Sequence, residues 1–414
     1  MLKIKLLPAG YGDCILISID SVENVNILID GGLSETYDKY LKKEVAHILA
    51  LNQKLNLVIS THMDNDHISG LVKLLNSSYS KLINEIWYNG LIQVVDSRFY
   101  SKEKDEYTKE DIKIIDKIIS QGVISDSQQK IGINSGMSLG VLITKNKIAL
   151  NTITSGKLIC DNTLYDRYEI AKNIYISVIG PSIDDIVLLE DQWKKEMVSQ
   201  NFMFRVNNKI KMTEAFEYQL MRIKSHYSPE SYKICGDGDL KKYIGDLSET
   251  DGSIVNKSSI SFILEYNEKK FLFLGDSVID ERFLSKLKKI VGNQYHFSAI
   301  KLPHHGSRFN ITHEFIHRYT ADEYYCSTNS KKYNHPDLET LAALICENTK
   351  FKKNIFNYPI KKLFFLIKLN GRINITMTLL WATRKIQLKG IFYEKTYCGS
   401  NSNKRKGCRN RLSC

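Results

Sequence analysis

Long apolar runs are missing from this sequence of 414 residues. No stretch approaches the roughly 18 apolar residues that suggest a membrane span. The first residues, MLKIKLLPAG, contain no long apolar segment before a small-residue cleavage site, and the apolar run at 14–19 (CILISI) ends at Asp20. We therefore expect neither a signal peptide nor an association with membranes.

Paired cysteines are also missing. The eight cysteines are scattered along the chain, with no C-x-x-C pair and no even framework of the kind that staples short secreted domains. Such a distribution is typical of reduced thiols. The sequence therefore predicts a cytoplasmic protein.

Acidic residues are scarce at the C-terminal end. The whole chain carries +12, but residues 351–414 contain fifteen Lys or Arg against the single acid Glu394, a net of +14, so residues 1–350 carry −2. An acidic or phosphate-bearing partner would be met at this basic end. Two interpretations stay open for the tail, which includes KRKGCRNR at 404–411: contact with nucleic acid, or a solvated and disordered end.

Short strands and helices alternate along most of the chain. The first 60 residues predict strands at 2–7, 14–19 and 25–30, a helix at 37–52 and a buried strand at 55–60. Two hairpin strands followed by a strand–helix unit favour an α/β sandwich over a helical bundle. Later strand-like runs are at 141–153, 174–180, 259–266 and 270–276.

Two polar, irregular stretches interrupt this alternation, at about 91–130 and 183–250. The sequence shows no repeat period. We therefore predict one catalytic domain over residues 1–395 that contains two insertions, followed by a basic and disordered tail at 396–414.

The segment THMDNDHISG, at 61–70, places two histidines and two aspartates within six positions. It lies between the strand at 55–60 and an apolar helical pattern at 67–75. Asp66 stands where a helix N-cap carboxylate would stand, so capping alone would explain that residue. It would not explain His62, Asp64 and His67, and imidazole with carboxylate at the end of a strand is the ligand set of a divalent metal such as Zn²⁺.

Three later segments place similar side chains just after apolar strands. Asp276 follows KFLFLG, His304 and His305 follow FSAIKLP, and His335 precedes Pro336 in the loop after YYCST. Open α/β folds place their chemistry at such strand ends. A turn aspartate is the alternative for Asp276 and a helix N-terminal residue the alternative for His335.

In this order and context, TH-x-D-x-DH-x-x-G, GDS, LPHHGS and N-HP resemble the metallo-β-lactamase fold. The set is most similar to the metallo-hydrolase domain of DNA-uptake competence proteins of the ComEC type and their freestanding relatives, whose opening hairpin GYGDCILI and ILIDGG also match. The resemblance runs from residue 2 to about 345. It implies an αββα sandwich that holds two divalent metal ions, Zn or Mn, with the carboxylate ligands favouring Mn²⁺ somewhat.

The resemblance also implies roles for single residues. His62 and Asp64 would bind the first metal and Asp66, His67 and His304 the second, with Asp276 between them. Two departures from the wider fold are Asp64, where a histidine is usual, and the missing histidine before Asp276, for which His226 is the one candidate. Four further roles complete the predicted site: Asp66 as a proton acceptor, His335 as a proton donor or a contact to a phosphate oxygen, and His305 and Ser307 as substrate contacts.

Three functions remain open on this basis. The first is hydrolysis of phosphodiester bonds by a metal-activated water, as a nuclease or nucleotide phosphodiesterase. The second is hydrolysis of a small ester, thioester or lactam, with the insertions as pocket walls. The third is a non-catalytic binding module that retains a metal, against which the complete ligand set argues.

Overall fold

The computed structural model describes residues 1–95, 113–119, 138–162, 167–199, 209–221, 243–245, 247–330 and 332–347, and the backbone of three later strands. The predicted tail at 396–414, most of the insertion at 91–130 and His226 lie outside the described residues. The predicted domain limits accordingly stay predictions.

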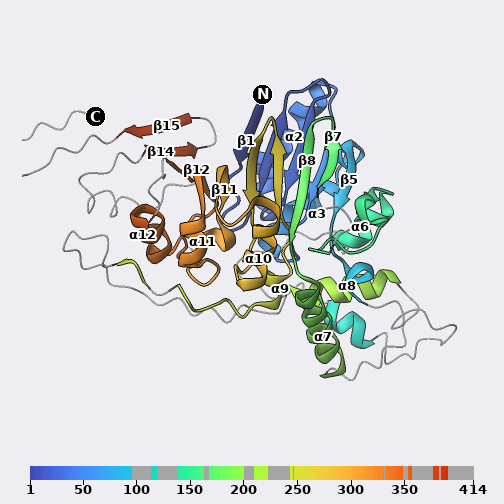
Figure 1. Cartoon of the computed structure of the whole chain (residues 1–414). Helices are drawn as coiled ribbons and strands as arrows, with labels where there is room; N and C mark the ends of the chain where they lie inside the picture. The colour runs from blue at the N-terminus through green and yellow to red at the C-terminus, as the bar shows by residue number, and fades with distance from the viewer. Residues whose placement is uncertain are drawn as a thin grey trace, which may run out of the picture.

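Two β-sheets pack face to face (Figure 1). In the first, β1, β2 and β3 are antiparallel neighbours, and β3, β4, β5 and β6 run parallel. Its strands, in spatial order, are β1 (Leu2–Leu6), β2 (Ile15–Ile19), β3 (Val25–Ile29), β4 (Leu55–Ile59), β5 (Ile83–Trp87) and β6 (Ala149–Leu150).

The second sheet begins with antiparallel neighbours and continues as a parallel run from β10 to β14. Neighbours in this sheet are also neighbours in the chain. From one edge to the other, its strands are β7 (Tyr168–Ala171), β8 (Ile174–Gly180), β9 (Ser261–Tyr266), β10 (Lys269–Phe273), β11 (Tyr295–Lys301), β12 (Tyr319–Cys326), β13 (Lys353–Phe356), β14 (Thr376–Trp381) and β15 (Arg384–Lys389).

Alternation of side chains builds the sandwich, because successive strand residues point to opposite faces. In β10, Phe271 and Phe273 join the apolar layer between the sheets, whereas Leu272 faces the helices outside. In β2, Ile15 and Ile17 likewise face the other sheet. The protein therefore has three apolar layers, one between the sheets and one beneath each outer set of helices.

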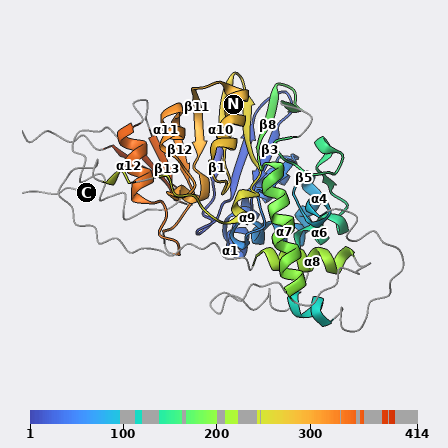
Figure 2. The same ribbon diagram turned by 60° about the horizontal axis from the view of Figure 1, so that its bottom comes forward.

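Helices cover both outer faces, as Figures 1 and 2 show. The arrangement is the predicted αββα sandwich. The helices on the side of the first sheet are α1 (Ser34–Thr36), a π-helical turn (Tyr37–Leu41), α2 (Lys42–Ala50), α3 (Asn65–Leu75), α4 (Leu91–Val94), α6 (Leu139–Lys145), α7 (Ile183–Ser199), α8 (Lys209–Leu220) and α9 (Ile254–Lys257). The helices on the side of the second sheet are α10 (Glu281–Val291), α11 (His313–Arg318) and α12 (Leu338–Glu347).

The predicted hairpin at 259–276 is confirmed as β9 and β10, with Asn267 and Glu268 at positive φ as a two-residue hairpin turn requires. The strand predicted at 141–153 is wrong over its first half. Residues 139–145 form α6, because the buried Glu217 carboxylate accepts hydrogen bonds from the first backbone N–H groups of that helix.

The parallel strands of both sheets end at the same edge of the sandwich. Asp30 follows β3, Asp276 lies in the turn after β10, and the two adjacent histidines follow β11. Among the helices of the described residues, none is both long and apolar enough to cross a membrane. The strand ends therefore bring together the polar groups considered next.

Candidate metal centre

The loop between β4 and α3 and the first turn of α3 carry four of the predicted ligands, and Asp30 holds the loop in place. The Asp30 carboxylate accepts hydrogen bonds from the Thr61 backbone nitrogen (2.8 Å) and the Thr61 hydroxyl (2.7 Å). The N-cap residue of α3 is Asp64, whose side chain makes no capping hydrogen bond. Asp66 lies in the first turn of α3, so the alternative that Asp66 caps this helix is wrong.

The loop after β3 packs directly against α3. Gly31 N donates to His67 O (2.7 Å), and Gly70 N donates to Gly32 O (2.8 Å). A Cβ on Gly70 would lie 1.9 Å from Gly31 O, which no backbone contact tolerates. Glycine at this position therefore lets α3 pack directly against the loop after β3.

His62 in this loop and His67 in α3 are both buried, and in each the Nδ1 atom has a hydrogen-bond partner. His67 Nδ1 lies 2.8 Å from Asp30 Oδ2, and His62 Nδ1 lies 3.0 Å from the Thr61 hydroxyl. In both residues Nε2 is buried and has no hydrogen-bond partner among the described residues. A hydrogen bond at one ring nitrogen is how proteins present the other nitrogen to a metal.

Asp276 lies at the centre of the cluster. Its Oδ2 atom is 3.4 Å from His67 Nε2, 3.6 Å from His305 Nε2, and 3.8 Å from both His62 Nε2 and His304 Nε2. Asp276 is 2% exposed, and its backbone nitrogen donates to Ser259 Oγ. One carboxylate oxygen thus faces four imidazole nitrogens that come from both sheets.

The adjacent histidines point to different surroundings. Both have positive φ values, 41° at His304 and 56° at His305, so the backbone turns sharply between β11 and Ser307. His304 Nδ1 lies 3.0 Å from Asn310 Oδ1 and 3.4 Å from an oxygen of Asp251. His305 lies instead beside the residues at the start of α3.

Of the two adjacent histidines, His305 is the one that lies beside Asp66 and His67. The ligand-type atoms of Asp66, His67 and His305 lie within 4.8 Å of one another, as do those of His62, His67 and Asp276. The sequence assigned His304 to this position and made His305 a substrate contact. The geometry differs because His304 is turned toward Asp251.

Asp64 remains at the edge of the cluster. Its side chain is about one-third exposed, and one oxygen lies 3.7 Å from His62 Nε2. The position is consistent with a ligand to the first metal only. Its role stays a prediction.

Sequence reasoning missed a buried ion pair behind the cluster. Lys301, at the end of β11, is 1% exposed and forms a salt bridge with Asp13, which is equally buried. Its ammonium also donates to Gly275 O (3.1 Å) and lies 3.9 Å from Asp276 Oδ1. The signal was a lysine inside the apolar run FSAIKL, together with an acid in GYGDC directly before a strand.

Burial and neighbouring charges shift the pKa values of several groups in the cluster. Burial alone would raise the pKa of Asp276, but the neighbouring histidines hold that pKa well below its usual range. Burial raises the pKa of Asp66 to about 6. Burial would lower the pKa of His304, yet Asp276 and Asp251 raise it to about 9, whereas burial and nearby cations lower the pKa of His305.

The remaining two predicted residues lie on the far side of His304. His335 is buried, with Nδ1 3.3 Å from Asp337 Oδ1 and its ring centroid 5.2 Å from that of His304. Ser307 is 1% exposed, and its hydroxyl accepts a hydrogen bond from Phe309 N. The structure thus places His335 beside the cluster and gives the Ser307 hydroxyl a role in its own turn.

The donor set fits divalent cations. Besides His62 and His67, both ring nitrogens of His305 and Oδ1 of Asp276 are buried without a hydrogen-bond partner among the described residues. Buried polar atoms in native proteins are nearly always satisfied, by protein, water or an ion. Imidazole and carboxylate atoms converging on one point are the donors that Zn²⁺ and Mn²⁺ take.

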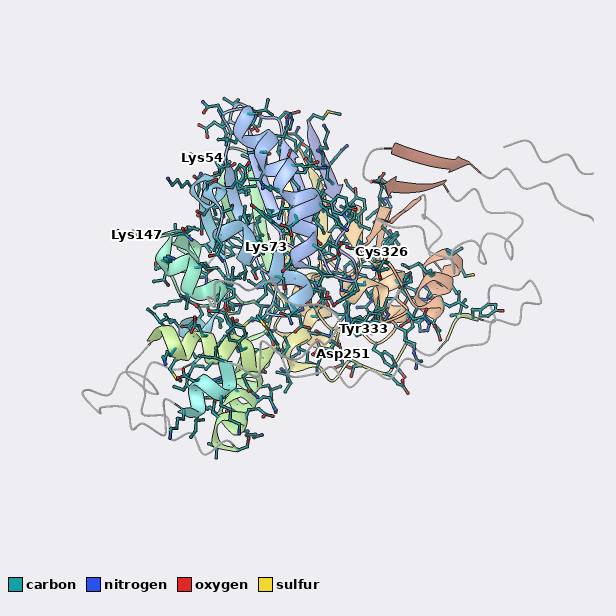
Figure 3. All side chains as sticks on the ribbon, turned by 180° about the vertical axis from the view of Figure 1, so that it is seen from behind. Lys54, Lys73, Lys147, Asp251, Cys326 and Tyr333 are labelled. Atoms are coloured by element: carbon teal, nitrogen blue, oxygen red, sulfur yellow. The ribbon has the colours of Figure 1, made fainter. Side chains whose placement is uncertain are left out.

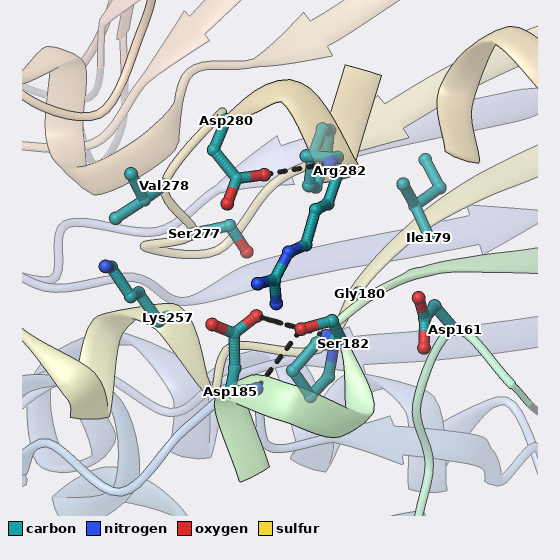
Figure 4. Close-up of a pocket in the computed structure, with 12 residues that line it drawn as sticks. Asp161, Ile179, Gly180, Ser182, Asp185, Lys257, Ser277, Val278, Asp280 and Arg282 are labelled. Carbon is teal, nitrogen blue, oxygen red and sulfur yellow. Dashed lines mark hydrogen bonds between the residues drawn. The ribbon is translucent and has the colours of Figure 1, made fainter. Parts of the chain in front are cut away.

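A separate pocket adjoins the cluster at Ser277, the residue after Asp276 (Figure 4). Its polar groups serve local structure. The Ser182 hydroxyl donates to Asp185 (2.6 Å), and Asp280 accepts from Phe283 N at the start of α10 (2.9 Å). We assign this pocket no ligand.

Residues 7–83 match the metallo-beta-lactamase superfamily. A search of curated proteins finds no match. Solved structures with similarity at low identity include the metallo-beta-lactamase fold protein YhfI from Bacillus subtilis (9% identity, TM-score 0.37, 91% of this chain and 96% of that one) and a putative metal-dependent hydrolase from Parabacteroides distasonis (10%, 0.34, 86% and 92%). A long form RNase Z from yeast is also similar (11%, 0.30, 86% and 36%).

The matched segment contains β1 to β4, α3 and the ligand-bearing loop. The two-sheet fold and the buried donor set extend the same architecture to Asp276, His304 and His305. Residues 7–83 therefore match the metallo-β-lactamase superfamily, and the two-sheet fold and the buried donor set are those expected of its metal-dependent hydrolases.

Proposed function

We propose that this protein hydrolyses phosphodiester bonds with two divalent metal ions, zinc or manganese, which Asp276 and the histidines and aspartates around it would hold. The observation that carries the proposal is the single oxygen of Asp276 surrounded by four imidazole nitrogens at 3.4–3.8 Å. A carboxylate in that position can serve two cations at once.

The geometry supports a revised assignment of the ligands. Asp66, His67 and His305 form one set, because their donor atoms lie within 4.8 Å of one another. His62 lies beside Asp64, and we assign both to the other position together with His304. His304 then takes the place for which the sequence offered only His226.

Bound divalent cations lower the pKa of water and stabilise the charge that develops on an attacked phosphate. The protein's own residues prepare that chemistry. Asp30 and Thr61 fix the rings of His67 and His62, and Lys301 keeps the Asp276 carboxylate in place beside Asp13. We propose that His335, held by Asp337, donates a proton to the leaving group.

Two features support a phosphodiester over a small ester, thioester or lactam. The motif set resembles the ComEC-type domain, and the excess of basic residues is confined to positions 351–414. A cytoplasmic location and contact of this basic end with nucleic acid are part of the same proposal. A non-catalytic module would have no need of so many buried donor atoms.

The test combines metal analysis with a panel of substrates. Purified full-length protein would be loaded with Zn²⁺ or Mn²⁺ and assayed on bis-p-nitrophenyl phosphate, single-stranded DNA, RNA, plasmid, p-nitrophenyl acetate and a chromogenic β-lactam. We expect the wild type to bind up to two metal ions per chain and to hydrolyse phosphodiesters. The Asp276→Asn variant should not hydrolyse them. Turnover of only the carboxylic ester or the lactam would replace the proposal with a small-substrate hydrolase.

A further inference from the structure

Two loops meet at the rim of the candidate metal centre. One, at 9–13, contains Asp13, and the other, described at 327–330 and 332–337, contains His335. The Ser327 hydroxyl donates to Gly12 O (2.6 Å), which ties the loops together. The rings of Tyr11 and Tyr333 then meet edge to face, with centroids 5.6 Å apart.

An exposed lysine lies over both rings. Lys332 Nζ is 4.4 Å from the ring centroid of Tyr11 and 4.8 Å from that of Tyr333. Ammonium groups at such distances are attracted to aromatic faces. The rings therefore restrict a side chain that would otherwise lose much rotamer freedom when it bound a ligand.

The loops that carry the two tyrosine rings contact the segments of the candidate metal centre. The backbone of Gly12, beside Tyr11, packs so closely on Asp66 that a Cβ there would lie 1.7 Å from Asp66 O. On the other loop, the Tyr333 ring is stacked 6.3 Å from that of His335.

The candidate metal centre and the surface around Lys332 differ in charge. The centre is built from buried carboxylates and imidazoles, which select cations, whereas Lys332 presents a positive charge to solvent. A substrate whose scissile phosphate lay at the centre would bring its next anionic group toward the rim. Lysine binds phosphate as a point charge.

We infer that Lys332, held between Tyr11 and Tyr333, binds a second phosphate of the substrate, next to the scissile one. This inference rests on the proposed function and narrows it. The substrate class becomes a nucleotide chain, or a nucleotide with a further phosphate, rather than an isolated phosphodiester.

Binding measurements test the inference without requiring turnover. Metal-loaded full-length protein would be titrated by calorimetry with thymidine 3′,5′-bisphosphate and with thymidine 5′-monophosphate. We expect the wild type to prefer the bisphosphate, and Lys332→Ala to reduce that preference about ten-fold, the loss of one charged contact. Lys332→Arg should retain most of it. Lys54→Ala, a change at an exposed lysine (Figure 3), serves as the matched control and should bind like the wild type.

Kinetics on two dinucleotides separate this inference from the proposed function. TpT has only the scissile phosphate, whereas pTpT has one more, so Lys332→Ala should lower the kcat/KM ratio of pTpT to TpT. An equal ratio and equal bisphosphate preference in wild type and Lys332→Ala would overturn the inference while phosphodiester turnover persisted. A selective loss of bisphosphate binding in a protein that cleaves neither dinucleotide would uphold the phosphate site and overturn the proposed function.

Discussion

At the residue scale, Asp276 is the side chain on which the candidate centre depends most. It faces four imidazoles, whereas Asp64 is one-third exposed and lies near His62 alone among them. We expect Asp276→Asn to remove most bound metal and to lower kcat/KM by at least about 100-fold. Substitutions of residues that only hydrogen-bond to a metal ligand cost up to about 100-fold, so the loss of a ligand should cost at least as much. Asp64→Asn should cost less.

Metal content by mass spectrometry and kcat/KM on bis-p-nitrophenyl phosphate measure both variants. If Asp64→Asn proved the more damaging of the two, the assignment of Asp276 to both metals would be wrong.

Asp30 is the second residue whose role the structure predicts. It touches no predicted substrate atom, but it accepts hydrogen bonds from Thr61 and orients His67. We expect Asp30→Asn to weaken metal binding about 10- to 100-fold, as outer hydrogen-bond partners of metal ligands typically do. Titration with a competing chelator measures this, with the exposed Asp20→Asn as the control. Equal metal affinity in Asp30→Asn and the control would show that Asp30 is only structural.

Sequence patterns located the histidines and Asp276, because each follows an apolar strand directly. They could not choose between His304 and His305, since the choice depends on a turn with positive φ at both residues and on Asp251, 53 positions away in the chain. The pair of Asp13 and Lys301 was missed for a similar reason. Each looks like an ordinary charged residue until the fold buries both.

At the element scale, the contact between Gly70 of α3 and Gly31 positions the ligand-bearing helix. Gly70→Ala would place a Cβ 1.9 Å from Gly31 O, so α3 must move. We expect a loss of about 2–3 kcal/mol in the free energy of unfolding, the usual cost of overpacking. Gly252→Ala is the matched control, because a Cβ there meets nothing within 4 Å. Urea denaturation of both variants checks this, and equal stability would contradict the contact.

The buried Glu217 of α8 makes a pH-dependent contribution to stability. Burial raises its pKa from the usual 4.5 to about 7, although the N–H groups of Leu139 and Gly140 and the Tyr88 hydroxyl oppose the shift. The folded protein therefore holds this proton more tightly than the unfolded chain. The contribution is fully present below pH 4.5 and is lost as the pH rises through 7.

Replacement by an uncharged isostere isolates this effect. Between pH 4.5 and pH 8, the wild type should lose about 3 kcal/mol of unfolding free energy relative to Glu217→Gln. Urea unfolding at several pH values gives the difference between the two proteins, in which other titrating groups cancel. Parallel pH profiles would show that Glu217 keeps an ordinary pKa.

Element types were predictable where a regular pattern and a turn signal agreed, as in the hairpin of β9 and β10. They were not predictable at 139–145, where an apolar run of β-branched residues forms α6. The cause is a tertiary contact, since Glu217 lies 77 positions after Gly140 and supplies the acceptors for the helix start. A local pattern contains no information on such a partner.

At the scale of the whole molecule, the charge asymmetry separates a nuclease from a small-substrate hydrolase. Deleting residues 397–414 removes five positive charges of a region outside the described structure. We expect the truncated protein to keep its rate on bis-p-nitrophenyl phosphate but to bind DNA or RNA more weakly, with a shallower dependence on salt. Filter binding at several salt concentrations measures this. Equal affinity and equal salt slope would indicate a merely solvated tail.

The αββα sandwich was predictable because the motifs at the strand ends resemble those of a known fold. The contribution of the second predicted insertion, at 183–250, to the hydrophobic core was not predictable. Its helices α7 and α8 bury Trp193 and Phe216 in the same apolar layer that packs under α3. Part of a stretch that looked irregular in sequence therefore belongs to the main core.

The position of Asp276 between histidines of both sheets has a consequence for folding. His67 and Asp276 are separated by roughly 200 residues, and ions that bind both would close that long loop as a covalent cross-link does. Stability should therefore rise with the concentration of free metal, and a chelator should lower the melting temperature of the entire sandwich rather than loosen only the loop before α3. The metal centre would then cross-link the two halves of the chain, and it would form only when both halves have folded.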